Sequence, residues 1–346
     1  MNMKRLVLAL MLSIVCFAAN AQTPEEAEKI NKWIDTYQQL NDAKDWQGMV
    51  SKAGLCKQEI PSWNHVYYYA GIAYYNLKDY DNAIMNLSIF IDKDQSEAGA
   101  YLLRGHSFSE KKDAAKAIAD YNVYLEKNPN DIPTMLAKAN AYLNINDLNG
   151  YAKELGVVLA KEPNNVKLLE NRASAYANLN NWQGAIEDYN KLIALNANNA
   201  DYYNNRAYAN YVIKTPESYK AAIIDYNKVI ELGKGDVTVY TALTALNSTL
   251  KDYKAEVAAW DKLVELQPDN FDNIYRRGAA KYNAADYKGA IADFDKVIQK
   301  DPKHINALKR RATAKTKLGD KVGAQADGKL IRELEGKPAP AAPVKK

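Results

Sequence analysis

The side chains with the greatest potential for chemistry in this sequence are three histidines and two cysteines. His65, His106 and His304 lie far apart, and neither Cys16 nor Cys56 has a second cysteine or a histidine at metal-ligand spacing. The sequence also has no glycine-rich phosphate-binding loop and no nucleophile elbow. We therefore predict that the chain is not an enzyme and that it has no metal and no cofactor.

Pairs of opposite charge recur at fixed positions of a 34-residue repeat. Six repeats have a basic residue at position 7 and an acidic residue at position 23, and the two other repeats in register have neither charge. The pairs are Arg104 with Asp120, Lys138 with Glu154, Arg172 with Asp188, Arg206 with Asp225, Arg277 with Asp293, and Arg311 with Asp327. A basic group wedged between helices needs a counter-charge, because leaving it unpaired is costly. The pattern favours structural ion pairs within each repeat over a basic ladder for phosphate or nucleic acid.

The repeat length follows from the prolines. Pro129 and Pro163 are 34 residues apart, and so are Pro268 and Pro302. The chain tiles into seven repeats at 64–97, 98–131, 132–165, 166–199, 200–236, 237–270 and 271–304, with a last repeat at 305–336. The region 22–63 holds one divergent helix pair. The segment 337–346, rich in proline, alanine and lysine, is typical of a disordered tail.

Each repeat is expected to form two helices. The residue at position 8 is small in seven repeats, which lets the two helices approach closely: Gly71, Gly105, Ala139, Ala173, Ala207, Gly278 and Ala312. A polar residue at position 16 can cap the second helix: Asp79, Asp113, Asp147, Asn181, Asp252, Asp286 and Asp320.

These positions resemble the hallmark positions of the tetratricopeptide repeat (TPR) family over about 310 residues. The resemblance implies an all-α fold: a right-handed superhelical solenoid of antiparallel helix pairs with about eight to nine repeats. Three residues depart from the family pattern. Tyr151 and Glu256 replace the small residue at position 20, and Gly328 replaces the aromatic residue at position 24. The last repeat is therefore expected to cap the array.

The resemblance also implies a binding surface, because the first helix of each repeat lines the concave face in this family. Positions 2, 5, 9, 12 and 13 would project there, and they supply tyrosines, asparagines and one histidine. These residues are Tyr68, Tyr75, His106, Asn140, Asn144, Asn178, Asn204, Tyr208, Tyr211, Tyr275, Tyr282 and Asn283. Such side chains suit a peptide or a protein segment. The alternative is that the tyrosines are half-buried packing between neighbouring repeats.

Repeat 237–270 differs from the others. It lacks the charge pair and follows Gly233 and Gly235, which permit a local change of path. A bend that divides the array into two concave surfaces is one interpretation, and ordinary drift of a single repeat is the other.

The N-terminus has the plan of a secretory signal peptide. Lys4 and Arg5 precede an apolar stretch, 6–19, and small residues at Ala19 and Ala21 predict cleavage after residue 21. The alternative is a lipoprotein that begins at Cys16, although Val15 is not the small residue such signals prefer. We expect an exported chain, periplasmic or secreted, without an integral membrane segment after cleavage.

The sequence as a whole predicts a non-catalytic scaffold of the bacterial cell envelope that binds a protein or peptide on its concave surface. The net charge of +4 excludes a polycation, so we expect no nucleic-acid partner. Two alternatives remain: a carbohydrate- or peptidoglycan-binding module, and an accessory subunit of an envelope enzyme or secretion complex.

Overall fold

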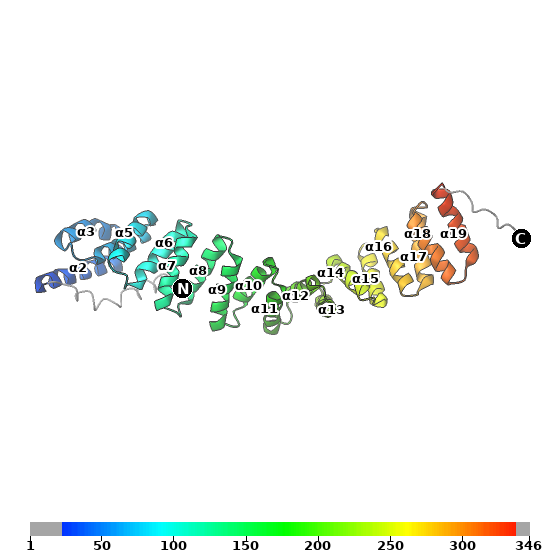
Figure 1. The fold of residues 1–346 in the computed structure, drawn as a ribbon, viewed down its shortest axis with the longest axis horizontal. Coiled ribbons are helices and arrows are strands. Elements are labelled where there is room, and N and C mark those ends of the chain that lie inside the picture. Colours follow the sequence, from blue (N-terminus) through cyan, green and yellow to red (C-terminus); the bar gives the residue numbers. More distant parts are fainter. Residues whose placement is uncertain (1–22, 337–346) are drawn as a thin grey trace. The chain divides into compact units, whose positions relative to one another are not determined.

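The computed structural model describes residues 23–336, and all regular structure in this range is α-helical. The predicted signal peptide and the predicted tail lie outside the described residues. The chain divides into two compact bodies, an N-terminal body that ends at Asn180 and a C-terminal body that begins at Asn181. Figure 1 labels the helices of both bodies. The all-α prediction is confirmed. Each body is described by itself below.

Both bodies are built from helices that follow one another in antiparallel pairs. The N-terminal body contains α2 (Pro24–Asp42), α3 (Trp46–Glu59), α4 (His65–Asn76), α5 (Tyr80–Lys93), α6 (Ala98–Glu110), α7 (Ala114–Lys127), α8 (Ile132–Asn144), α9 (Leu148–Lys161) and α10 (Val166–Asn178). The C-terminal body contains α11 (Trp182–Leu195), α12 (Ala200–Ile213), α13 (Pro216–Glu231), α14 (Val237–Thr249), α15 (Tyr253–Leu266), α16 (Phe271–Asn283), α17 (Tyr287–Lys300), α18 (Ile305–Lys317) and α19 (Lys321–Leu334). Between residues 23 and 336, none of these helices has the length and apolar character that crossing a bilayer requires.

The turn inside each helix pair has a recurrent backbone conformation. The residue before the N-cap of the second helix is left-handed at the same register nine times: Lys44, Lys78, Lys112, Asn146, Asn180, Lys214, Lys251, Ala285 and Gly319. The next residue is the N-cap of the second helix, and in all nine cases its side chain accepts a hydrogen bond from a backbone N–H of that helix. Asp286, for example, accepts a hydrogen bond from the backbone N–H of Gly289 at 2.9 Å. The predicted caps at position 16 are confirmed in all seven repeats for which they were named.

Close contact between the two helices of a pair depends on position 8. A Cβ atom added at Gly278 would lie 2.9 Å from Cε1 of Phe294, and one added at Gly105 would lie 2.9 Å from Cε1 of Tyr121. The glycine therefore makes room for the aromatic ring at position 24 of the same repeat. That ring is fully buried in both repeats and forms part of the core.

The beginning of the N-terminal body has an aromatic core. The rings of Tyr37 and Tyr69 stack with centroids 4.7 Å apart and an interplanar angle of 2°. Trp63 and Phe90 belong to the same cluster of buried side chains. Cys56 is fully buried in this cluster, where burial raises the pKa of its thiol to about 12. The thiol is therefore a structural group rather than a reactive one.

Candidate functional site

The charged residues singled out in the sequence meet as ion pairs within their repeats in five of six cases. The shortest N–O distances are 2.8 Å for Arg104–Asp120, 2.8 Å for Lys138–Glu154, 2.6 Å for Arg206–Asp225, 2.6 Å for Arg277–Asp293 and 2.5 Å for Arg311–Asp327. The sixth proposed pair joins Arg172 of the N-terminal body to Asp188 of the C-terminal body, and it stays a prediction.

Four of these five pairs contain an arginine, and each of these arginines also contacts a third helix. Arg277 donates from Nε and Nη2 to the two carboxylate oxygens of Asp293, while its Nη1 lies 3.1 Å from Asp261 in the preceding repeat. The same Nη1 contact recurs from Arg104 to Ser88, from Arg206 to Asn190 and from Arg311 to Asp295. We call this three-helix arrangement the arginine fork. It joins the two helices of one repeat to the second helix of the repeat before it.

The forks are largely buried, so their charged groups have lost most of their contact with water and depend on each other for stabilisation. The side chain of Arg277 is 13% exposed and that of Asp293 is 3% exposed. Hydrogen bonding to its aspartate raises the pKa of the Arg206 guanidinium above its ordinary value, so the pair stays charged. A buried bidentate pair of this kind fixes geometry, and removing one partner leaves an uncompensated charge.

Repeat 237–270 lacks the fork, and an apolar groove of about 800 Å³ lies at the same place. Leu243 stands where the arginine would be, Ala259 replaces the aspartate, and Asn227 of α13 is the residue that Nη1 would reach. All three line the groove, together with Ile223 and Ile224. The groove therefore follows from the replacement of two long polar side chains by leucine and alanine.

The predicted contact residues of the N-terminal body fall into two groups. Tyr68 is 4% exposed, and its ring lies 5.3 Å from that of Phe90, so its prediction as a ligand contact is wrong. Position 5 of this repeat points into the aromatic core rather than outward. Tyr75 and His106 are half-buried, and Nδ1 of His106 lies 3.0 Å from the hydroxyl of Tyr121. Burial lowers the pKa of His106.

Asparagines make up the exposed group in the N-terminal body. Asn140 and Asn144 lie one turn apart on α8, and Asn178 lies near the end of α10. The side chain of Asn178 donates to the backbone carbonyl of Ser174 at 2.8 Å, which leaves its amide oxygen available as an acceptor.

In the C-terminal body, α12 presents the most exposed of the predicted tyrosines. Tyr208 is 54% exposed and Tyr211 is 37% exposed, and half-buried Asn204 lies one turn before Tyr208. The ring of Tyr208 meets Trp182 edge-on at 5.8 Å, and the ring of Tyr211 lies 6.2 Å from Tyr219. Both tyrosines are thus held from the side while much of each side chain faces solvent.

The tyrosines of α16 are more strongly engaged within the protein. The hydroxyl of Tyr275 accepts a hydrogen bond from Nε of Arg310 at 3.0 Å, and its ring lies 5.1 Å from His304. The ring of Tyr282 meets Tyr287 at 5.4 Å. Both tyrosines are half-buried, so the packing interpretation of the sequence fits them, and Asn283 beside them is exposed.

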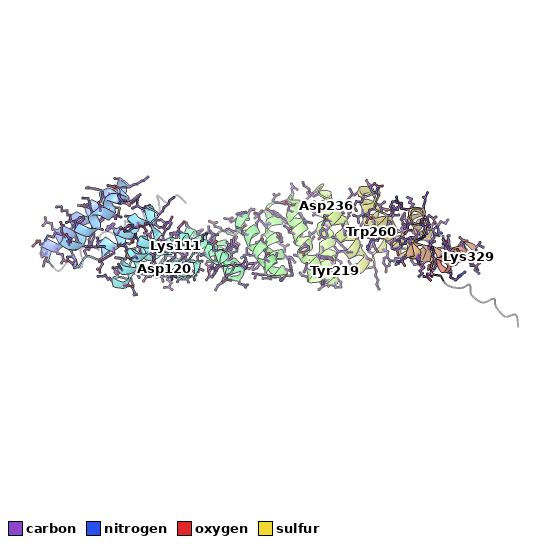
Figure 2. All side chains as sticks on the ribbon, turned by 90° about the horizontal axis from the view of Figure 1, so that it is seen from above. Lys111, Asp120, Tyr219, Asp236, Trp260 and Lys329 are labelled. Atoms are coloured by element: carbon purple, nitrogen blue, oxygen red, sulfur yellow. The ribbon has the colours of Figure 1, made fainter. Side chains whose placement is uncertain are left out.

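A polar pocket of about 460 Å³ lies among α14, α15 and α16. It is lined on α14 by Thr241, Ala245 and Ser248, which occupy the same repeat positions as Asn204, Tyr208 and Tyr211 on α12. Its inner wall includes Glu256 and Trp260 of α15, and Figure 2 labels Trp260 on this body. Part of the pocket lining thus shares the repeat positions of the predicted contact residues on α12.

Glu256 is the unusual group in this pocket. It is 7% exposed, and one oxygen, Oε1, accepts from the indole nitrogen of Trp260 at 3.4 Å. The other oxygen, Oε2, is buried without a hydrogen-bond partner. Burial raises the pKa of Glu256, and the neighbouring Trp260 and Ser248 oppose that shift.

Two features of the structure go beyond the sequence predictions, and the sequence contains a recognisable signal for one of them. The third arm of the arginine fork could have been found from the polar residue that lies 16 positions before each arginine, namely Ser88, Asn190, Asp261 and Asp295. Glu256 stood out as a departure from the expected small residue, but nothing in the sequence showed that its carboxylate would line a pocket. Within residues 23–336, no three histidine, cysteine or acidic side chains gather in a metal-binding arrangement.

Comparison with protein families identifies the repeat. Models described as tetratricopeptide repeat match residues 68–132, 166–199 and 272–304. No curated protein matches the chain.

Among solved structures, the chain is similar to YrrB, described as a TPR protein with an unusual peptide-binding site. The identity is 19%, over 54% of this chain and 94% of that one, with a TM-score of 0.41. It is also similar to a tetratricopeptide repeat protein from Parabacteroides merdae, with 20% identity over 68% of this chain and 93% of that one and a TM-score of 0.37. A third is the C-terminal part of a TPR repeat-containing protein from Cytophaga hutchinsonii, with 17% identity over 69% and 97% and a TM-score of 0.41. Paired helices run throughout the described residues, and three separate stretches of the chain match tetratricopeptide-repeat models.

Proposed function

We propose that this protein is a non-catalytic scaffold that binds an extended peptide or protein segment on the face formed by the first helices of its repeats. The observation that carries the proposal is the exposed, laterally supported pair Tyr208 and Tyr211 on α12. Large rings held from the side lose little conformational freedom on binding, and their hydroxyls can pair with a peptide backbone.

The neighbouring asparagines support the same interpretation. Asn204 on α12 and Asn283 on α16 occupy the first-helix face, and an amide can both donate to and accept from an extended backbone. The pocket among α14, α15 and α16 adds a concave site between these helices. A flat helical surface without such a pocket would offer a peptide side chain no place to be enclosed.

The experiment is a selection of peptides from a random display library against the purified protein. The affinity of the selected peptides is then measured for the wild type, for a double tyrosine variant and for a control variant. We expect Tyr208→Ala with Tyr211→Ala to weaken the selected peptides by about tenfold or more. The matched control is Ile224→Ser, which alters an apolar side chain on α13 that is 68% exposed. No enriched peptide, or binding that depends on Ile224 and not on the tyrosines, would overturn the proposal.

We also propose that the protein acts in the bacterial cell envelope. The support is the N-terminal pattern of Lys4 and Arg5, an apolar stretch and the small residues Ala19 and Ala21. Expression of the full chain in a bacterium, followed by mass determination of the mature protein, tests this directly. A mature chain that begins at Gln22 is expected, and a chain that retains Met1 and stays in the cytoplasm would contradict it.

A further inference from the structure

We propose that the polar pocket among α14, α15 and α16 binds the ammonium group of a lysine side chain of the bound peptide, with Glu256 as its acceptor. The proposal rests on the proposed function, because it names the side chain that a bound segment would place in this pocket. It is carried by a buried carboxylate oxygen that has no partner in a pocket that opens to solvent.

The first argument is the incomplete hydrogen bonding of Glu256. A buried carboxylate oxygen without a donor is costly, because it has given up water without gaining a protein partner. Proteins leave few such groups, so each one calls for an explanation. A ligand that brings an N–H donor to Oε2 of Glu256 supplies the missing partner.

The second argument is the charge of the pocket. Its ionisable lining consists of Glu256, Asp272 and Arg276. Arg276 is already paired with Asp272, at 2.6 Å from Nε to Oδ2, so the carboxylate of Glu256 is the charge left without a counter-ion. A cationic group entering the pocket would neutralise it.

The third argument is the balance of donors and acceptors. The hydroxyls of Thr241 and Thr244 donate to the helix carbonyls of Val237 and Thr241 at 2.7 and 2.8 Å. Each hydroxyl has thereby used its one hydrogen, so its oxygen can act only as an acceptor. A primary ammonium group has three donors and no acceptor, so it can donate both to Glu256 and to the hydroxyl oxygen of the exposed Thr241.

The fourth argument separates lysine from arginine. A guanidinium binds a carboxylate best through both oxygens, in a planar fork. Oε1 of Glu256 already accepts from Trp260, so one oxygen is open. A compact ammonium needs one oxygen, and the rest of the lysine side chain can lie along the apolar wall that Ala245, Trp260 and Leu263 provide.

The test uses a single-residue probe, so that it does not depend on finding the natural peptide. N-acetyl-lysine methylamide is titrated into the protein while the indole N–H resonance of Trp260 is followed by NMR. We expect a saturable shift of that resonance. N-acetyl-norleucine methylamide has the same stem without the charge, and we expect it to give no saturable shift.

Variants of α15 test the role of the carboxylate. Glu256→Gln removes the charge while keeping nearly the same shape, and we expect the lysine probe to bind about tenfold more weakly or not at all. Glu265→Gln removes an exposed carboxylate of the same helix that pairs with Lys262, and we expect no change. Urea unfolding of both variants verifies that each one is folded.

Three results would overturn the inference. They are no saturable shift with the lysine probe, equal affinity of wild type and Glu256→Gln for that probe, and an affinity for N-acetyl-arginine methylamide as high as for the lysine probe. Each of them leaves peptide binding at Tyr208 and Tyr211 untouched, since that is measured separately on α12. Conversely, a failed peptide selection together with a clear lysine shift would contradict the scaffold function but not the pocket chemistry.

Discussion

Two adjacent repeats of the C-terminal body, 237–270 and 271–304, have the same helix pair and differ in how they are fastened. In the second, Arg277 joins Asp293 of its own repeat to Asp261 of the repeat before. In the first, Leu243 and Ala259 occupy the corresponding places, and an apolar groove lies along α13. The groove and the polar pocket both border the repeat without a fork, while a further opening lies along α19, in a repeat that has one.

The difference indicates what the fork does. A repeat array is held by the fit between neighbours, so each junction can be changed with little effect on the others. A buried arginine that binds three helices fixes their register, whereas a leucine contributes contact area without fixing direction. Among the repeats of the C-terminal body between residues 200 and 336, repeat 237–270 is therefore the one whose junction with the repeat before it is not fixed by an arginine.

The largest effect is expected from Arg206→Ala. It would leave Asp225, which is 2% exposed, as a buried charge without its guanidinium partner. We expect the free energy of unfolding of the C-terminal body to fall by about 3–5 kcal/mol. Urea unfolding measures this loss. The double variant Arg206→Ala with Asp225→Ala should regain part of the lost free energy of unfolding. If the losses of the two single variants simply add, Arg206 and Asp225 are not coupled.

A smaller effect is expected from building the fork into the repeat that lacks it. Leu243→Arg alone places an unpaired charge at a buried site and should destabilise, since Leu243 is 4% exposed. Combined with Ala259→Asp, the arginine gains its partner and can reach Asn227 of α13. We expect a favourable coupling energy of about 1–3 kcal/mol in the double-mutant cycle. A coupling near zero would mean that this junction cannot accept the fork.

The next effect concerns Glu256 and depends on pH. Burial raises its pKa, so the folded protein binds this proton more tightly than the unfolded chain, and the ionised carboxylate destabilises the fold at neutral pH. We expect Glu256→Gln to be more stable than wild type by about 1 kcal/mol at pH 7.

The sign of the pH dependence follows from the same shift. As the pH falls through the raised pKa towards that of the unfolded chain, wild type takes up the proton and its deficit disappears. Urea unfolding of both proteins at about five pH values between about pH 4 and pH 8 measures how the difference in their free energies of unfolding changes with pH. A difference that grows on acidification would contradict the assignment.

The smallest effect is expected for Lys228→Ala. Lys228 forms an exposed pair with Glu231, three residues later on α13, at 2.7 Å. Solvent and salt screen such pairs, so we expect no measurable change in urea unfolding. A loss as large as that of Arg206→Ala would erase the distinction between the fork and an ordinary surface pair.

The sequence predicted the helix pairs, the caps and the residue types of the charge pairs because each depends on local spacing. It could not show that Tyr68 turns into the core, because that burial comes from Phe90 and the aromatic cluster around it. It could not show the pocket at Glu256 either, since the pocket needs three helices from two repeats. Position in a repeat identifies the face of a helix, whereas burial depends on the neighbours.

Native-state hydrogen exchange across the C-terminal body tests the central claim, that the arginine fork holds the first helix of a repeat against the repeat before it and that α14 lacks this contact with α13. The account predicts that the backbone amides of α14 open with a lower free energy than those of α16, which carries Arg277. Equal protection of the two helices, or stronger protection of α14, would contradict it.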